Sequence, residues 1–223
     1  MSLHLNLMHA EAAVAFAEKH LRGRASNKPE DIIHTHQENL RRFATGISAN
    51  KEIQQEIVLD SLANSFNVRM GCQQLHGERA GAISSARDAR KLAGERLNAA
   101  AIIRDGIGNC FEHAVLACHH LNGKGVASYM VDTDDETNHC FVLIGLGGGL
   151  DGTTVQAAPN ALPGAPFNAA FAVVCDPWYH EWFAVGSFWA TKMHRILMTT
   201  NKRATGLLPA QVPFTFTASN HVT

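Results

Sequence analysis

The sequence lacks paired cysteines, an excess of charge of either sign and any long apolar run. Its 223 residues contain five cysteines, and no two of them form a Cys-x-x-Cys pair. They are Cys72, Cys110, Cys118, Cys140 and Cys175. An odd number of scattered cysteines argues against a disulfide framework and against a zinc ribbon. We therefore expect reduced thiols in the folded protein.

The sequence has no excess of charge of either sign, because its 19 Lys and Arg residues nearly balance its 20 Asp and Glu residues, for a formal net charge of −1. Proteins that bind nucleic acid or an anionic membrane surface are normally rich in basic residues. The balance therefore predicts no nucleic-acid partner. With 46% hydrophobic and 17% charged residues the composition is that of a globular protein. A chain of this length buries roughly 70% of its unfolded surface without a metal or a disulfide.

No apolar run reaches the ~18 residues that a membrane span requires, so we expect no membrane-spanning segment. The first twenty residues also lack the basic, apolar and small-residue segments of a signal peptide, because His4, His9, Glu11 and Glu18 interrupt the apolar positions. This predicts a chain made in the cytoplasm of the producing cell. Export or injection into a target cell by a specialised secretion system remains compatible with it.

The character of the sequence changes near residue 100. Residues 1–100 predict a helical N-terminal region, with no nucleotide-binding glycine pattern and no basic stripe. Its expected helices are Leu7 to Leu21, Pro29 to Phe43, Lys51 to Phe66 and Ile83 to Leu97. We interpret this region as a scaffold, with a docking role for a chaperone or a secretion partner left open. Residues 101–223 predict one further compact unit.

This second region predicts one helix followed by a series of strands. The helix begins after Gly106 and ends at Asn122-Gly123, and the β-rich runs are Val126 to Val131, His139 to Leu146 and Phe171 to Asp176. That order is typical of an α+β domain with an antiparallel sheet packed on the helix. Residues 145–166 predict a long irregular segment, residues 187–198 a helix, and the tail beyond Pro209 irregular structure.

Cys110 stands at the predicted start of this helix. Asn109 is a favourable N-cap residue, and Glu112 lies where the acid of a capping box would stand. Cys110 is then the first helical residue, where the positive end of the helix dipole lowers the pKa of a thiol. Gly106 and Gly108 allow a tight turn that leaves the sulfur accessible. This environment predicts a nucleophile.

A buried, unreactive thiol is the alternative interpretation, because cysteine is among the most buried residue types. It suits Cys118 and Cys175, which lie in apolar runs, better than Cys110, which follows a polar cap. The prediction for Cys110 depends on a base supplied from elsewhere in the chain.

A histidine and an aspartate stand at the ends of two predicted strands. His139 opens one run, and Asp176 closes the other directly before Pro177, which stops the strand. If the two strands pair, Asp176 accepts a hydrogen bond from His139 and orients it toward Cys110. Nucleophile, base and orienting acid then follow in the order Cys, His, Asp.

Two other residues compete for these roles. His113 is a rival base on the nucleophile's own helix, where the geometry for proton transfer is poor. Asp151 is a rival acid that follows a run of glycines in a predicted turn. We favour His139 and Asp176 because a strand fixes each of them.

Three short segments carry a resemblance to a known superfamily. They are Gly-Asn-Cys-Phe-Glu-His-Ala at 108–114, Asn-His-Cys-Phe-Val-Leu-Ile at 138–144 and Val-Cys-Asp-Pro-Trp at 174–178. Together they resemble the papain-like and transglutaminase-like cysteine hydrolases, and most of all the bacterial papain-like effector and toxin domains. The resemblance covers residues 104–180 and implies a papain-like core, in which the nucleophile helix packs on an antiparallel sheet.

The resemblance implies a Cys-His-Asp triad that performs acyl transfer on an amide without a cofactor. Cys110 matches its nucleophile, His139 its base and Asp176 its orienting acid. The interval from Cys110 to His139 is shorter than in many papain-like proteases, which leaves the peptide specificity open.

Further residues are candidates for supporting roles. An upstream Gln or Asn commonly completes the oxyanion hole in such enzymes, and Gln73, Gln74 and Asn109 are the candidates here. Trp178 belongs to an aromatic cluster after the predicted acid. It either packs in the core or additionally shields the pair of His139 and Asp176 from water.

The triad leaves the reaction open, because fold and triad do not determine the acyl donor. Proteolysis and glutamine deamidation are the leading alternatives, followed by transglutamination and a peptidoglycan-directed amidase. The expected partner is a protein or peptide substrate. The effector resemblance implies a role in virulence, with the target in another cell.

Two interpretations belong to other functional classes. A metal site could draw on the helix that carries Cys110, with added ligands from the next strand, but the paired spacings that zinc prefers are absent. Its ligands would come from Cys110, His113, Cys118, His119, His120, His139 and Cys140. A non-catalytic interaction module would require a missing triad member, and all three are present.

Overall fold

The computed structural model describes residues 2–21, 64–133, 139–146, 154–157, 170–189, 192 and 214–219, of which 64–76, 154–157 and 214–219 are described by their backbone alone. The chain divides into two compact units. One unit comprises Met1–Arg22 and Glu95–Thr223, and the other comprises Gly23–Gly94. In the second unit the described element is a long helix, α4 (Asn64–Leu92).

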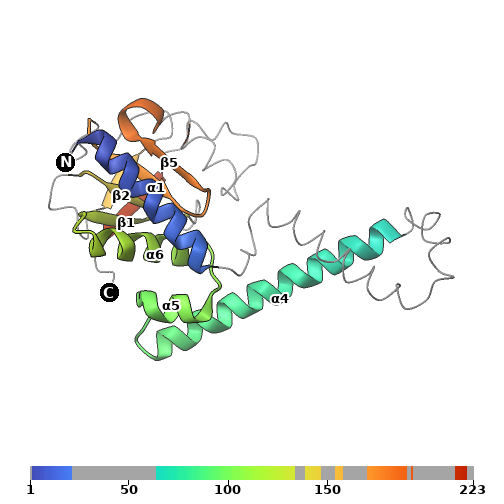
Figure 1. Cartoon of the computed structure of the whole chain (residues 1–223). Coiled ribbons are helices and arrows are strands. Elements are labelled where there is room, and N and C mark those ends of the chain that lie inside the picture. The colour runs from blue at the N-terminus through green and yellow to red at the C-terminus, as the bar shows by residue number, and fades with distance from the viewer. Residues whose placement is uncertain are drawn as a thin grey trace. The chain divides into compact units, whose positions relative to one another are not determined.

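The first unit is built from helices and one antiparallel sheet (Figure 1). Its helices are α1 (Leu3–His20), α5 (Ala99–Asp105) and α6 (Cys110–Gly123). Its strands are β1 (Ser128–Thr133), β2 (Cys140–Ile144), β3 (Thr154–Ala157), β4 (Val173–Asp176), β5 (Glu181–Ala184) and β6 (Phe214–Ser219). The strand order is β3-β6-β1-β2-β4-β5, and every neighbouring pair is antiparallel.

Alternation along the central strands gives each face of the sheet its own core. One face packs against α1 and α6, whose small buried residues, such as Ala13 and Ala114, allow close approach to the strands. Its strand residues are Met130, Cys140, Val142, Ile144, Val173 and Cys175. The other face forms a second apolar cluster that includes Tyr129, Val131, Phe141, Leu143, Val174, Phe183 and Trp189.

Polar contacts near each end of α1 help to hold it against the sheet. Near its start, the Asn6 side-chain amide donates a hydrogen bond to the Phe171 carbonyl at 2.8 Å. Gly145 lies beside this bond with φ of 78°, and a Cβ there would come within 2.3 Å of the same carbonyl. Near its end, Glu18 pairs with the ring of His180 in the turn after β4.

The predicted α+β class and the antiparallel sheet packed on the 110–123 helix are confirmed. The sequence predicts a separate helical region over residues 1–100, whereas α1 belongs to the same compact unit as the sheet. Its stripe of buried alanines makes it part of the core. A stripe of small residues gives only a weak amphipathic signal, so the sequence did not distinguish α1 from the helices that follow.

Several predicted element boundaries also change. The helix expected over 83–97 ends at Leu92, before Gly94 with φ of 70°, and α5 follows. The irregular segment expected over 145–166 contains β3, and the tail expected to be irregular contains β6. Residues 185–189 are helical, two residues earlier than expected. The helix expected over 29–43 and most of that expected over 51–66 lie outside the described residues.

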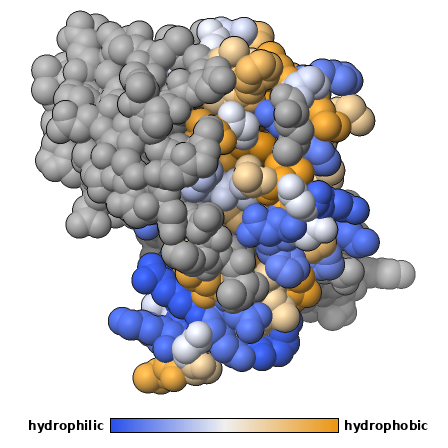
Figure 2. All heavy atoms as spheres, turned by 90° about the vertical axis from the view of Figure 1, so that its left-hand side faces the viewer, coloured by the Kyte–Doolittle hydropathy of each residue, from blue (hydrophilic) through white to orange (hydrophobic). Residues whose placement is uncertain are grey.

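The surface of the described part carries apolar and polar side chains side by side (Figure 2). Its large exposed apolar residues include Leu5, Met8, Phe171, Trp182 and Phe188. Exposed apolar residues of this kind are ordinary on folded proteins and do not by themselves indicate a partner. Within the described residues, no helix combines the length and apolar content needed to cross a membrane.

Candidate active site

Cys110 is the first residue of α6, as the sequence predicts. Asn109 is the N-cap, and its backbone N–H donates a hydrogen bond to Glu112 Oε2 at 2.9 Å, the returning bond of a capping box. The Glu112 carboxylate is buried beneath this turn. Backbone N–H groups in the first turn of a helix have no acceptor within the helix and carry its positive dipole end. The first turn of α6 therefore offers hydrogen-bond donors to an oxyanion formed beside Cys110.

Two glycines shape the chain just before the nucleophile candidate. Gly106 ends α5 in the left-handed conformation with φ of 67°, and its N–H donates to the Ile102 carbonyl at 2.9 Å. Gly108 lies against Glu112, where an added Cβ would stand 2.3 Å from the Glu112 Cβ. A side chain at 108 would thus displace the acid that caps α6. The glycines expected to permit a tight turn do so for these two different reasons.

Antiparallel pairing of β2 with β4 brings His139 and Asp176 to the same edge of the sheet. The register pairs Val142 with Cys175 and Ile144 with Val173, so β2 begins where β4 ends. His139 directly precedes β2, and Asp176 is the last residue of β4. The predicted strand pairing is confirmed, and it places the imidazole next to the carboxylate.

The two side chains form a buried ion pair. His139 Nε2 lies 2.6 Å from Asp176 Oδ2, and both side chains have no exposed surface. The other carboxylate oxygen, Oδ1, accepts a hydrogen bond from the Tyr179 backbone N–H at 3.1 Å. A carboxylate only accepts hydrogen bonds, so Nε2 carries a proton and Nδ1 is the atom that can accept one in the neutral ring.

The charge state of His139 follows from these contacts. Burial lowers the pKa of the ring, but the charge and hydrogen bond of Asp176 outweigh burial, and Cys110 adds a further rise. The pKa of His139 is thereby raised from 6.5 to about 10. The contribution of Cys110 to this rise is smaller than that of Asp176. Nδ1 is buried, and it has no hydrogen-bond partner among the described residues.

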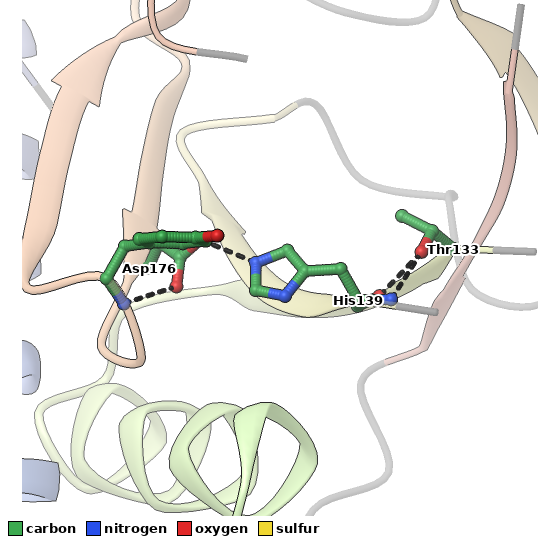
Figure 3. A network of polar contacts seen from close by, with 4 residues as sticks. Thr133, His139 and Asp176 are labelled. Carbon is green, nitrogen blue, oxygen red and sulfur yellow. Dashed lines mark hydrogen bonds and ion pairs between the residues drawn. The ribbon is translucent and has the colours of Figure 1, made fainter. Parts of the chain in front are cut away.

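The backbone of His139 is fixed by a residue that sequence reasoning missed, Thr133 at the end of β1 (Figure 3). Its hydroxyl accepts a hydrogen bond from the His139 N–H at 2.7 Å and donates one to the His139 carbonyl at 2.8 Å. The Thr133 N–H donates to the same carbonyl at 2.9 Å. A threonine that ends one strand just before a histidine opens the next would have been the available sequence signal.

Aromatic rings enclose the imidazole. The ring centroids of Trp178, Tyr179 and Phe141 lie 5.5, 5.6 and 6.0 Å from that of His139. Trp178 is 2% exposed, so it packs in the core as one of the two interpretations predicts. Its ring also lies beside the imidazole, and its role as a shield for the His–Asp hydrogen bond stays a prediction.

The other described thiols differ from Cys110 in exposure. Cys110 is partly exposed, whereas Cys118, Cys140 and Cys175 are buried. Burial raises the pKa of Cys118 to about 12 and raises the pKa values of Cys140 and Cys175 well above the ordinary value. The side chain of Cys72 lies outside the described residues. Among the described thiols, Cys110 is thus the one placed to react.

The rival residues lie elsewhere or are engaged. The Nδ1 atom of His113 is within 2.8 Å of the Asn109 carbonyl on its own helix, whereas the acid candidate pairs with His139. Asp151 lies outside the described residues. Gln73 and Gln74 belong to α4 in the other compact unit, and their side chains are not described. No group of described His, Cys, Asp and Glu residues is arranged to hold a metal ion.

Comparisons with known proteins add no relative. No family model matches the chain, and no curated protein and no solved structure is significantly similar to it. The chemistry of the site therefore follows from its own geometry.

Proposed function

We propose that this protein is a cysteine-dependent amide hydrolase or acyltransferase with Cys110 as nucleophile, His139 as base and Asp176 as orienting acid. The observation that carries the proposal is the buried pair of His139 and Asp176, together with a partly exposed Cys110 at the start of α6. Nucleophile, base and orienting group within reach of one another are the usual arrangement of an activated thiol.

The chemistry follows from this arrangement. The Cys110 thiolate attacks the carbon of a carboxamide, and the first-turn N–H groups of α6 stabilise the oxyanion. The imidazolium of His139 gives its proton to the leaving amine as the C–N bond breaks and a thioester remains. A second nucleophile then attacks the thioester, assisted by His139, and restores the thiol. With a peptide bond as substrate, water gives proteolysis. With a glutamine side chain as substrate, water gives deamidation and an amine gives transglutamination.

We infer that the core around these residues is papain-like, with α6 as the nucleophile helix. The order of the three motifs in the sequence supports this, as does a cysteine at the start of a helix that packs on an antiparallel sheet. The bacterial effector domains that the motifs resemble suggest a target-cell protein as substrate, altered by proteolysis or by glutamine deamidation. On this proposal the chain is made in the cytoplasm and delivered by a specialised secretion system, with α4 and its unit available to bind a chaperone.

Mass spectrometry of a target-cell proteome tests the reaction. The extract is incubated with the wild type or with Cys110→Ala, and peptides are compared. We expect changes that require Cys110: new chain ends if the reaction is proteolysis, or glutamine converted to glutamate if it is deamidation. Identical peptide sets for the two proteins, across extracts from several hosts, would contradict the proposal for those proteomes.

A further inference from the structure

The hydrogen bonds between Thr133 and His139 replace a regular step of the sheet. The pairing of β1 with β2 runs from Ser128 opposite Ile144 to Asp132 opposite Cys140, so the next pair in register is Thr133 opposite His139. In a regular antiparallel ladder every second pair of residues exchanges two backbone hydrogen bonds. The bond from the Thr133 N–H to the His139 carbonyl marks this pair as one of them.

Only one of these two bonds is a backbone bond. The Thr133 N–H donates to the His139 carbonyl at 2.9 Å, as a ladder requires. The returning bond from the His139 N–H goes to the Thr133 hydroxyl at 2.7 Å instead of a carbonyl. The hydroxyl proton then reaches the His139 carbonyl at 2.8 Å. Both polar groups of the His139 backbone are thus held by one side chain.

The bond to the Thr133 hydroxyl takes the place of a backbone hydrogen bond, and the regular pairing of β1 with β2 ends there, at His139. β2 begins at Cys140, one residue after His139. Figure 3 shows the result: Thr133 holds the backbone on one side of His139, and Asp176 meets the ring on the other. The ring is therefore fixed at two separate places, its backbone and its Nε2 atom.

Thr133 is itself well anchored. It is 7% exposed, and its backbone pairs with Phe216 of β6 on the side away from β2. The hydrogen bonds from Thr133 to His139 are therefore made by a residue of an interior strand, since β1 lies between β6 and β2. Hydroxyl bonds of this kind usually compete with regular structure at strand ends and turns. Here the competing bond orients a residue of the candidate active site.

We propose that Thr133 is a positioning residue, whose hydroxyl fixes the backbone of His139 so that the imidazole meets both Asp176 and the Cys110 thiol. This inference rests on the proposed function, since it assigns Thr133 a task within that site. Small errors in the placement of reacting groups cost up to about 10²-fold in rate. Loss of the hydroxyl should therefore slow Cys110 far more than loss of the methyl group.

The test uses Thr133→Val, which keeps the shape without the hydroxyl, and Thr133→Ser, which keeps the hydroxyl. Ser128→Ala is a matched control, because its buried hydroxyl lies at the other end of β1 and bonds to Asn122 at 3.2 Å. All variants carry Cys72→Ser, and the rate of Cys110 alkylation by iodoacetamide is measured against pH. His139→Gln serves as the reference for a missing base.

We expect T133V to slow alkylation at neutral pH by about tenfold to a hundredfold and to move the pH profile toward that of H139Q. T133S and S128A should stay within about twofold of the wild type. If H139Q is slow but T133V matches T133S, the role of Thr133 is overturned while the proposed function stands. If H139Q itself matches the wild type, the proposed function fails as well.

Folding of each variant is followed by its thermal transition. If T133V unfolds, Thr133→Ala takes its place in the series, because it differs from T133S only in the hydroxyl. If T133V and T133A both lack a thermal unfolding transition, Thr133 is needed for the sheet as a whole, and a specific positioning role is overturned. A merely structural contribution would lower the melting temperature without moving the pH profile of Cys110.

Discussion

His139 Nε2 lies 2.6 Å from Asp176 Oδ2, and neither side chain has any exposed surface. A charged pair removed from water in this way is costly unless its partners satisfy it, and removal of one partner is more costly still. In this protein Tyr179 supplies a further hydrogen bond to Asp176, and Thr133 fixes the backbone of His139. The arrangement holds the imidazole in a fixed, buried position at the edge of the sheet.

Asp176→Asn removes the charge that holds the proton on His139. Without that charge the pKa of His139 should fall from about 10 toward its ordinary value or below, because burial then dominates. NMR titration of the imidazole measures this shift. Glu181→Gln is the matched control, because Glu181 pairs with Asp176 in the sheet register but its carboxylate binds Lys192 at 3.2 Å. An unchanged His139 titration in D176N would contradict the ion pair.

Asp176→Ala should also destabilise the protein. Removing one partner leaves the other charge buried, a change that costs about 3–5 kcal/mol in the free energy of unfolding. Denaturant unfolding at pH 6 compares this variant with D176N, which keeps an acceptor for Nε2 and should lose less. Equal stability of D176A and the wild type would mean that the pair is not buried in solution.

The proton on His139 links stability to pH. Its pKa is about 10 in the folded protein against an ordinary value of 6.5, so the stabilisation is complete below pH 6.5 and is lost as pH rises through 10. Between about pH 6.5 and 9 the unfolding free energy should fall by up to about 1.4 kcal/mol per pH unit. Buried thiols such as Cys118 lower the unfolding free energy further only above about pH 9. Burial raises the pKa of Cys118 from 9.0 to about 12 in the folded protein.

This slope is measured best in Cys110→Ala, which removes the thiol of the proposed nucleophile. Adding Asp176→Asn to that background should flatten the slope between about pH 6.5 and 9. A slope of the same size in both proteins would assign it to other groups.

Gly108→Ala tests whether the turn before α6 positions the nucleophile. The new Cβ would stand 2.3 Å from the Glu112 Cβ, so the first turn must move and stability should fall by about 1–3 kcal/mol. Gly123→Ala is the control at the other end of α6, where a Cβ meets nothing within 4 Å. That change should leave stability unchanged or raise it by up to about 1 kcal/mol. Comparable Cys110 alkylation in G108A and G123A would argue against the turn's role.

Trp178→Phe should preserve most of the packing against His139, because an aromatic ring remains at a position that is 2% exposed. Trp178→Ala should lower the unfolding free energy by about 3–5 kcal/mol and admit water to the ion pair, which weakens its effect on the His139 pKa. Denaturant unfolding and imidazole titration of both variants measure the two effects. If W178A is as stable as the wild type and the pKa of His139 is the same in both, Trp178 has no shielding role.

The features that the sequence predicted correctly have local causes. A helix begins at Cys110 because Asn109 and Glu112 form its cap within a few residues. The pairing of His139 with Asp176 could also be predicted, because a strand that starts with one and a strand that ends with the other need only pair side by side.

What the sequence could not predict depends on distant segments. The role of Thr133 requires the exact register of β1 against β2, since a slip of one residue would turn its side chain to the other face. The place of β6 between β1 and β3 is likewise decided by pairing with strands far along the chain. The membership of α1 in the core follows from alanines whose burial depends on the sheet beneath them.

Activation of Cys110 by His139 is tested most directly by the pH dependence of Cys110 alkylation in Cys72→Ser, measured with and without His139→Gln. We expect iodoacetamide to label Cys110 before Cys118, Cys140 and Cys175, because these three are buried. Labelling at about pH 6–7 should slow by at least about tenfold when His139 is replaced, since a base of this kind contributes about 10²–10⁴-fold. Equal rates with and without His139, or equal labelling of the buried thiols, would contradict an activated nucleophile.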